Sequence, residues 1–304
     1  MRLASLLWHG NPSLGLAIDG KILVLNELAK ADPVRWQALA GAGDVSPLWT
    51  ESSRRLIAEI HAQVMASGIP SNWEPFCEQL ENCRWLSPVA VPEKIICIGL
   101  NYSDHAAESG MQIPKEPVIF GKYNNALVGA SGPVILPSNS MQVDYEAELA
   151  VVLGRQAKRV SEPEAMSCVG GYTIMHDVSA RDWQFRTGQW LSGKTFDTFA
   201  PCGPCLVTPD EVPDPHSLGI RLTLNGRIMQ DSNTSNLIFG IPALISYISH
   251  IFTLQPGDII STGTPPGVGF ARRPPVFLQS GDVVEIAIDK LGTMRHACIA
   301  ERHI

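Results

Sequence analysis

A nearly continuous apolar run, Ala147–Leu153, constrains the fold of this 304-residue chain more than any other segment. Seven residues is a typical strand length, and a strand without regular alternation is buried on both faces of a sheet. Many more short apolar runs follow residue 86, separated by the 26 Gly and 23 Pro of the chain. We therefore expect a mainly β protein of the α+β class, with residues 147–153 inside its sheet.

The character of the sequence changes near residue 85. Residues 1–85 contain a hairpin signal at Asp19-Gly20 and an amphipathic helical pattern over residues 52–65, but few residues suited to catalysis. The later part has a second hairpin signal at Asn225-Gly226 and a helical pattern over residues 242–252. We expect a small N-terminal α+β domain (residues 1–85) and a larger domain (residues 86–304) that carries the functional site.

Composition excludes several classes of partner. The net charge of −7 comes without any basic stripe, so nucleic acid is not an expected partner. No stretch of about 18 apolar residues predicts a membrane span, and the N-terminus lacks the long apolar core of a secretory signal. The seven cysteines are scattered rather than arranged as a disulfide framework, which indicates a reducing compartment. We expect a cytoplasmic protein.

Two glutamates stand at the start of the apolar run. Glu146 and Glu148 are two residues apart, so in a strand they face the same side, and Asp144 could join them. Like charges beside a buried strand repel each other and lose hydration, and a hard cation would remove that cost. The alternative is an edge strand that carries charges against aggregation, but edge strands usually use Lys.

A third carboxylate follows the predicted strand at residues 170–176. Asp177 ends that strand, and three carboxylates without Cys or His suit Mg²⁺ or Mn²⁺ better than Zn²⁺. His176 would point to the opposite face, as a structural histidine.

His105 and Glu108 are three residues apart and would be neighbours on a helix, where His105 could act as a general base and Glu108 could orient it. Spacing alone favours an ordinary exposed helix.

Three further motifs invite functional readings. Residues 188–195 formally match a phosphate-binding loop, but Trp190 and Leu191 are bulky for one and no strand precedes it. Residues 202–205 have the Cys-Gly-Pro-Cys spacing of a thiol oxidoreductase, yet a strand-like segment follows where that motif opens a helix. The loop at residues 262–269 could hold a carboxylate through its backbone N–H groups, or could simply connect two strands.

Taken in order, these pieces resemble the fumarylacetoacetate hydrolase superfamily over about residues 90–300, specifically its shorter acylpyruvate hydrolase and oxaloacetate decarboxylase–tautomerase branch. The matching pieces are Gly99-Leu100-Asn101-Tyr102 with His105 and Glu108, Glu146-x-Glu148, His176-Asp177-Val178-Ser179-Ala180-Arg181-Asp182-x-Gln184, Gly193-Lys194-Thr195-Phe196-Asp197, and Thr262-Gly263-Thr264-Pro265-Pro266-Gly267-Val268-Gly269. The resemblance implies a mixed β-sandwich roll and a homodimer. Larger members carry an additional Asp ligand near the position of Asn101, so fumarylacetoacetate itself is a less expected substrate.

The resemblance also implies a role for each candidate residue. The metal ligands would be Glu146, Glu148 and Asp177, and the cofactor Mg²⁺ or Mn²⁺. A water would be activated by His105 and Glu108, and the developing enolate would be stabilised by Lys194. The substrate would be contacted by Arg181, Gln184 and Thr264.

This ligand set suits a small 2-oxo acid or 1,3-dicarbonyl compound, which chelates a divalent ion through two oxygens and reacts through a metal-bound enolate. Hydrolysis of a C–C bond in an acylpyruvate-type compound is the leading expectation. Decarboxylation of oxaloacetate and keto–enol tautomerisation or isomerisation need the same enolate and stay open. A non-catalytic metal-binding relative and a thiol oxidoreductase are more remote alternatives.

Overall fold

The structure, a computed structural model, describes residues 1–104 and 113–301. Its strands are β1 (Arg2–Trp8), β2 (Asn11–Ile18), β3 (Lys21–Val24), β4 (Cys77–Gln79), β5 (Ile95–Gly99), β6 (Val118–Lys122), β7 (Leu127–Gly129), β8 (Val134–Leu136), β9 (Val143–Asp144), β10 (Ala147–Leu153), β11 (Val169–His176), β12 (Ser179–Ala180), β13 (Ala200–Val207), β14 (Gly219–Leu224), β15 (Arg227–Asn233), β16 (Ile259–Ser261), β17 (Val283–Ile288) and β18 (Gly292–Ala300).

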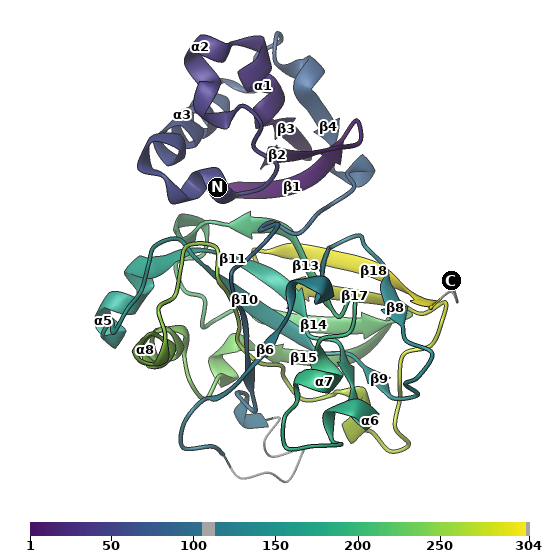
Figure 1. The fold of residues 1–304 in the computed structure, drawn as a ribbon. Coiled ribbons are helices and arrows are strands. Elements are labelled where there is room, and N and C mark those ends of the chain that lie inside the picture. The colour runs from purple at the N-terminus through teal and green to yellow at the C-terminus, as the bar shows by residue number, and fades with distance from the viewer. Residues whose placement is uncertain (105–112, 302–304) are drawn as a thin grey trace.

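Helices lie around the sheets, and most of them are short (Figure 1). The α-helices are α1 (Leu25–Ala31), α2 (Pro33–Trp36), α3 (Glu51–Ser67), α5 (Glu162–Ala165), α6 (Arg181–Gln184), α7 (Leu191–Lys194) and α8 (Ile241–Ile251). Single 3₁₀ turns span Gln37–Leu39, Ser46–Trp49, Glu74–Phe76, Leu80–Asn82, Asn124–Ala126, Met166–Cys168, Pro209–Glu211, Thr234–Asn236 and Gly269–Ala271. No helix in the described ranges has the length and hydrophobicity to span a bilayer.

The largest sheet runs in the order β4-β3-β2-β1-β13-β11-β10-β16-β5-β6, with β7 beside β13. A second sheet, β15-β14-β17-β18-β8, packs against it through contacts of β14, β17 and β18 with β10, β11 and β13. Every residue of β10 is buried between these layers. The mainly β, sandwich-like α+β architecture expected from the sequence is confirmed.

β10 is an interior strand, since it pairs antiparallel with both β11 and β16. Edge protection therefore does not explain the two glutamates at its start. The uninterrupted apolar sequence is the consequence of burial on both faces, as the sequence predicts.

Residues 1–85 form the layer drawn at the top of Figure 1, with β1–β4 backed by α1 to α3. Their strands continue the main sheet, because β1 pairs antiparallel with β13. The predicted helix over residues 52–65 is α3, which buries Ile57, Ile60 and Val64 against the core. The predicted hairpins at Asp19-Gly20 and Asn225-Gly226 join β2 to β3 and β14 to β15.

Candidate active site

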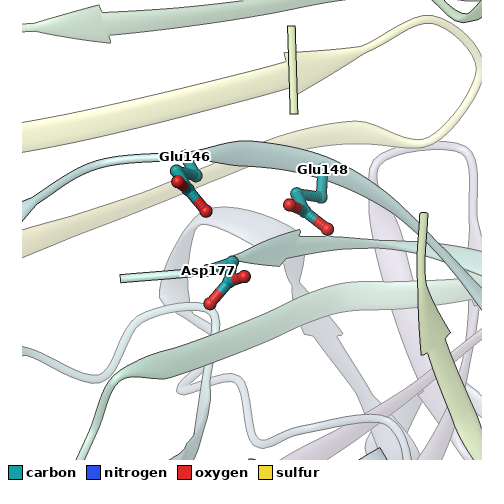
Figure 2. A group of neighbouring side chains, drawn as sticks. All are labelled: Glu146, Glu148 and Asp177. Atoms are coloured by element: carbon teal, nitrogen blue, oxygen red, sulfur yellow. The ribbon is translucent and has the colours of Figure 1, made fainter. Parts of the chain in front are cut away.

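Three carboxylates meet at the adjoining ends of β10 and β11. Glu146 and Glu148 come from the start of β10 and Asp177 follows β11, where its N–H donates to the carbonyl of Glu146 at 3.0 Å. Figure 2 shows the two glutamate side chains on one segment and Asp177 on the neighbouring one. One carboxylate oxygen from each lies within 4.8 Å of the others, and all three residues are buried. The sequence predicts this arrangement from the two-residue spacing of Glu146 and Glu148 and from the position of Asp177 at the end of a strand.

Lys194 places its ammonium group between two of these carboxylates. At the end of α7, its Nζ donates to Oε2 of Glu146 at 2.6 Å and to Oδ2 of Asp177 at 2.8 Å. Burial alone would lower the pKa of Lys194, but the charges of Asp177 and Glu146 outweigh burial and hold that pKa above its ordinary value. Lys194 is therefore protonated in the metal-free site, as a cation between two carboxylates.

The backbone before Lys194 can approach α6 because residue 193 is glycine. A Cβ there would lie 2.5 Å from the backbone nitrogen of Gln184 and 2.6 Å from the carbonyl oxygen of Ala180. Gly193 thus serves close packing between α6 and α7 rather than a phosphate-binding loop. The sequence interpretation that set aside a nucleotide site at residues 188–195 agrees with this geometry.

Arg181 connects the cluster to Asp144. Its Nη2 donates to Oε1 of Glu146 at 2.6 Å, its Nε donates to Oδ2 of Asp144 at 2.9 Å, and its Nη1 donates to Oε1 of Gln184 at 2.9 Å. Burial would raise the pKa of Glu146, but the charges of Lys194 and Arg181 hold it far below its usual range. Glu146 is therefore ionised.

The sequence left open whether Asp144 joins Glu146 and Glu148 as a candidate metal ligand. In the structure it does not join them. Its Oδ1 accepts from the backbone N–H of Tyr145 at 2.8 Å and of Gly269 at 2.7 Å. Its Oδ2 accepts from Arg181 and from the N–H of Phe270 at 3.0 Å. The strand prediction places the residue correctly, but these donors use its oxygens, so Asp144 fixes the 267–270 loop against Arg181.

Glu148 forms no salt bridge with any cation in the part of the chain that the structure describes. Its Oε2 accepts from Ser261 Oγ at 2.6 Å and from the N–H of Gly263 at 2.9 Å. Burial and the charges of Asp177 and Glu146 raise the pKa of Glu148 well above its usual value. The ionised form of Glu148 therefore needs another positive charge close by.

Lys122 is a buried cation that sequence reasoning missed. Its Nζ donates to the carbonyl oxygens of Val178 at 2.9 Å, of Phe199 at 2.8 Å and of Lys194. It also lies 2.7 Å from Oδ1 of Asp177. Three carbonyl acceptors use its three N–H bonds, so its contact with Asp177 is electrostatic rather than a hydrogen bond.

The donor set fits a hard divalent cation. Oδ1 of Asp177 is buried and accepts no hydrogen bond, which leaves its lone pairs available as a ligand. The four carboxylates of Asp144, Glu146, Glu148 and Asp177 share only three cations in the described structure: Lys122, Arg181 and Lys194. All ligand atoms are oxygens, the type that Mg²⁺ and Mn²⁺ prefer. The acidic cluster can therefore hold such an ion.

A cavity of about 180 Å³ opens above the cluster. An engineered cavity of about 150 Å³ is known to bind benzene, so this volume admits a compact organic acid. Its lining includes Glu146, Glu148, Arg181, Gln184, Lys194 and Thr264, and the apolar side chains of Ile98, Leu100, Phe120, Phe185, Trp190, Val268 and Phe270. Every candidate substrate-contacting residue expected from the sequence thus lines one pocket with two of the candidate metal ligands.

Gln230 is a second residue that the sequence did not indicate. Its side-chain amide connects β10 to the loop at residues 262–269. Oε1 accepts from the N–H of Ala147 at 2.9 Å, and Nε2 donates to Thr264 Oγ1 and to the carbonyl of Pro265, each at 2.8 Å. Thr264 Oγ1 in turn donates to the carbonyl of Ala147 at 2.9 Å. This network fixes Thr264 beside the glutamates.

Asn101 has a structural role. Its Nδ2 donates to the carbonyls of Thr262 at 2.8 Å and Phe239 at 3.0 Å, and its Oδ1 accepts from the N–H of Phe239 at 2.8 Å. The side chain is thereby committed to the backbone. The set of three carboxylate ligands stays a prediction.

The cysteine pair and His176 belong to the core. Cys202 and Cys205 lie on β13 as buried free thiols, and burial raises the pKa of each to about 12. Such thiols are not ionised near neutral pH, so a thiol oxidoreductase is not supported. His176 points away from the carboxylates, and its Nδ1 lies 2.8 Å from Nε2 of the buried His296. His105 and Glu108 lie outside the described residues.

Comparison with known proteins decides the family. The family model described as "Fumarylacetoacetate (FAA) hydrolase C-terminal" matches residues 94–299. The chain belongs to the fumarylacetoacetate hydrolase family. It is also 45% identical to the mitochondrial oxaloacetate tautomerase fahd2 of Xenopus laevis, over 95% of this chain and 86% of that protein. The mitochondrial oxaloacetate tautomerase Fahd2a of Rattus norvegicus is 52% identical over 69% of this chain and 67% of its own length.

Solved structures extend the comparison to a metal complex of the fumarylacetoacetate hydrolase family. The maleylpyruvate hydrolase of Sphingobium sp. SYK-6, solved with manganese(II) and pyruvate, aligns with a TM-score of 0.75. It is 32% identical and covers 99% of this chain and 100% of its own. The family assignment and fold expected from the sequence are therefore confirmed, as an enzyme family with a metal-binding acidic cluster.

The names of the two oxaloacetate tautomerases correct one expectation. Both are called mitochondrial, which contradicts the cytoplasmic location expected from the sequence. Scattered free cysteines favour a reducing compartment, and the cytoplasm and the mitochondrial interior are both reducing. Cysteine usage therefore could not separate the two locations.

Proposed function

We propose that this protein is a divalent-metal-dependent keto–enol tautomerase of oxaloacetate or of a closely related 2-oxo dicarboxylate. The observation that carries the enolate chemistry is the charged Lys194 ammonium, fixed by Glu146 and Asp177 at the base of the pocket. The choice of tautomerisation over hydrolysis rests on the 45% identity to an oxaloacetate tautomerase over nearly the whole chain. This choice favours what was an alternative at the level of sequence over the leading expectation of C–C hydrolysis.

The site residues would divide the work as follows. Glu146, Glu148 and Asp177 would hold Mg²⁺ or Mn²⁺, which supplies Lewis-acid polarisation of the 2-oxo group. His105, oriented by Glu108, would take the C3 proton and return it to the substrate oxygen, which gives the enol. Lys194 would stabilise the negative charge that the substrate oxygen carries between these two proton transfers. Its position is set before the reaction by two hydrogen bonds, so no reorganisation is needed. Phe120 and Trp190 would exclude bulk water and strengthen that interaction.

Gln184 and Thr264 would orient the substrate. Both line the pocket, and each is held by a protein contact: Gln184 by Arg181 and Thr264 by Gln230. Arg181 itself would mainly hold Glu146 in place, because its three side-chain nitrogens already bond protein acceptors. Preorganised contacts of this kind favour one orientation of a small substrate.

Hydrolysis of an acylpyruvate-type compound is the second candidate. It is supported by the similarity to a maleylpyruvate hydrolase that was solved with manganese(II) and pyruvate. Hydrolysis needs a nucleophilic water in addition to the enolate, and His105 and Glu108 are the proposed pair that activates it. A His105→Ala variant would then lose hydrolysis of acetylpyruvate.

A product-resolved assay separates these reactions. Oxaloacetate in D₂O is followed by proton NMR with Mg²⁺ or Mn²⁺, and acetylpyruvate is tested in parallel. The proposal predicts faster exchange of the C3 protons of oxaloacetate, abolished by EDTA and by Asp177→Asn. Metal-dependent pyruvate from oxaloacetate would instead establish a decarboxylase. Acetate plus pyruvate from acetylpyruvate, without faster C3 exchange, would establish the hydrolase.

A further inference from the structure

Arg273 is the one cation among the described pocket-lining residues that has no carboxylate partner. The other two lining cations, Arg181 and Lys194, each bind two carboxylates of the site. The Arg273 side chain is exposed, and its only described contacts run from Nη1 to the carbonyl oxygens of Ala271 at 3.4 Å and Arg272 at 3.0 Å. Its guanidinium group is therefore available to a ligand.

The backbone that carries Arg273 is firmly held. The neighbouring Arg272 donates from Nε to Tyr145 Oη at 3.2 Å and to the carbonyl of Gly267 at 3.1 Å. The N–H of Val276 and of Arg272 both donate to the carbonyl of Gly269, at 3.0 Å and 3.2 Å. The backbone at Arg273 is therefore fixed, so only its side chain has to be ordered when a ligand binds.

Gly269 lets this loop reach the catalytic cluster. Its N–H donates to Oδ1 of Asp144, and a Cβ at this position would lie 2.6 Å from that oxygen and 1.8 Å from the carbonyl oxygen of Val276. Asp144 also binds Arg181, which binds Glu146. The position of Arg273 is thus tied to the metal-ligand cluster through two hydrogen-bonded residues.

Phe270 and Phe185 line the same pocket as Arg273. Their rings pack with centroids 5.4 Å apart, and both residues line the pocket while remaining partly exposed. These rings form an apolar part of the pocket wall, against which a carboxylate without a cationic partner would lose part of its hydration.

We propose that Arg273 is a specificity-determining residue that binds the second carboxylate of a dianionic 2-oxo acid, the carboxylate that lies away from the metal-ligand cluster. This inference rests on the proposed function, which places the 2-oxo group and its neighbouring carboxylate at Glu146, Glu148 and Asp177. A guanidinium fork binds a carboxylate in two parallel hydrogen bonds, so Arg273 selects both charge and shape. The pocket then prefers dicarboxylates to 2-oxo acids with a neutral end.

The test compares oxaloacetate with 2-oxobutyrate, in which a methyl group replaces the second carboxylate. Arg273→Gln is expected to lower kcat/KM for C3-proton exchange of oxaloacetate by about 10- to 100-fold and that of 2-oxobutyrate by less than about 2-fold. Arg273→Lys is expected to restore part of the loss, because it keeps the charge without the fork. Circular dichroism verifies that each variant is folded.

Arg186→Gln is the matched control. Arg186 is an exposed cation next to Phe185, but its guanidinium lies over the Trp183 ring and it does not line the pocket. Its neutralisation changes net charge equally and is expected to leave the preference for oxaloacetate unchanged. An equal loss for both substrates in Arg273→Gln, or no loss, would overturn the inference.

A binding measurement separates this inference from the proposed function. Calorimetry of the Mn²⁺-loaded protein compares oxaloacetate with 2-oxobutyrate, independently of turnover. Tighter binding of oxaloacetate in the wild type that disappears in Arg273→Gln supports the role of Arg273, even if wild-type protein fails to exchange C3 protons. The same affinity ratio in both proteins would refute the role of Arg273, whatever reaction the enzyme performs.

Discussion

The ammonium nitrogen of Lys122 lies 2.7 Å from Oδ1 of Asp177, but its N–H bonds are directed to backbone carbonyls. This arrangement gives Asp177 a compensating charge without using the lone pairs of Oδ1. The buried Asp177 is thus paired with a cation and still offers an oxygen to a metal ion. Burial and the positive charge of Lys194 lower the pKa of Lys122. Together they outweigh the charge of Asp177, which alone would raise that pKa.

Replacing Lys122 by Met should destabilise the protein by about 3–5 kcal/mol, because it removes one of the two cations that compensate the buried Asp177 and leaves three carbonyls without their donor. Urea unfolding followed by circular dichroism measures the change. Lys158→Met is the control: that residue is exposed, so its replacement should change stability by less than about 0.5 kcal/mol. Equal stability of the two variants would show that Lys122 does not support the site.

Glu148→Gln should separate metal binding from folding. The raised pKa of Glu148, caused by burial and by Asp177 and Glu146, means that its ionised form destabilises the metal-free protein. A neutral amide at this position should raise metal-free stability at pH 8 by at least about 1 kcal/mol. The same variant should lose the stabilisation by Mg²⁺, which for wild type is about 2.7 kcal/mol at 100 times Kd.

Thermal unfolding with and without Mg²⁺ checks both parts of that expectation. For an acid with a raised pKa, the native state binds more protons than the unfolded state above pH 4.5. The stability of the metal-free wild type should therefore fall relative to that of the variant as pH rises. A variant that is less stable without metal but still stabilised by Mg²⁺ would contradict the assignment of Glu148 as a ligand.

The buried pair His176 and His296 should cause stability to fall at mildly acidic pH. Burial lowers the pKa of His296 to about 4, and it lowers that of His176 further below the ordinary value. Between pH 6.5 and 4 the unfolded chain binds protons that the folded chain does not, so each histidine decreases stability by up to about 1.4 kcal/mol per pH unit of acidification.

Urea unfolding of wild type and His296→Gln between pH 4 and pH 7.5 measures this contribution. The variant should show a shallower dependence on pH, and the two curves should run parallel above pH 7. Parallel curves over the whole range would show that His296 is not held neutral by the fold.

Gln230→Leu should disturb the pocket from outside it. The variant removes the acceptor of the Ala147 N–H and the donor to Thr264 Oγ1, which should cost about 2–4 kcal/mol of stability and lower kcat/KM. Gln156→Leu is a suitable control, because exposed Gln156 makes only a 3.3 Å side-chain contact with Gln255. Steady-state kinetics and urea unfolding should show no effect of the control. Unchanged kcat/KM in Gln230→Leu would remove its proposed positioning role.

Local sequence patterns predict the part of the site that depends on strand geometry. The two-residue spacing of Glu146 and Glu148 fixes their common side, and the apolar residues after them fix the burial of β10. Asp177 follows from the end of the neighbouring strand. The roles of Lys194 and Arg181 required the resemblance to a family, because no local pattern shows that α6 and α7 fold back over β10.

Residues that act across the fold had no such signal. Lys122 ends β6 after four half-buried residues, and nothing nearby in sequence indicates that its ammonium group reaches Asp177. Gln230 lies in a hairpin strand of the second sheet and acts on β10 in the first. Asp144 has the spacing of a third ligand, but loop N–H groups from residues 269 and 270 use its oxygens. Tertiary contacts of this kind decide the role of a polar residue.

The most direct test of the account is the rate of enol-to-keto conversion of oxaloacetate, measured by stopped-flow ultraviolet absorbance on wild type and Asp177→Asn. The account predicts that Mg²⁺ or Mn²⁺ accelerates conversion by the wild type, that EDTA abolishes the acceleration, and that the variant shows none while carbon dioxide and pyruvate stay at background levels. Acceleration that survives both EDTA and Asp177→Asn, or no acceleration by the metal-loaded wild type, would contradict it.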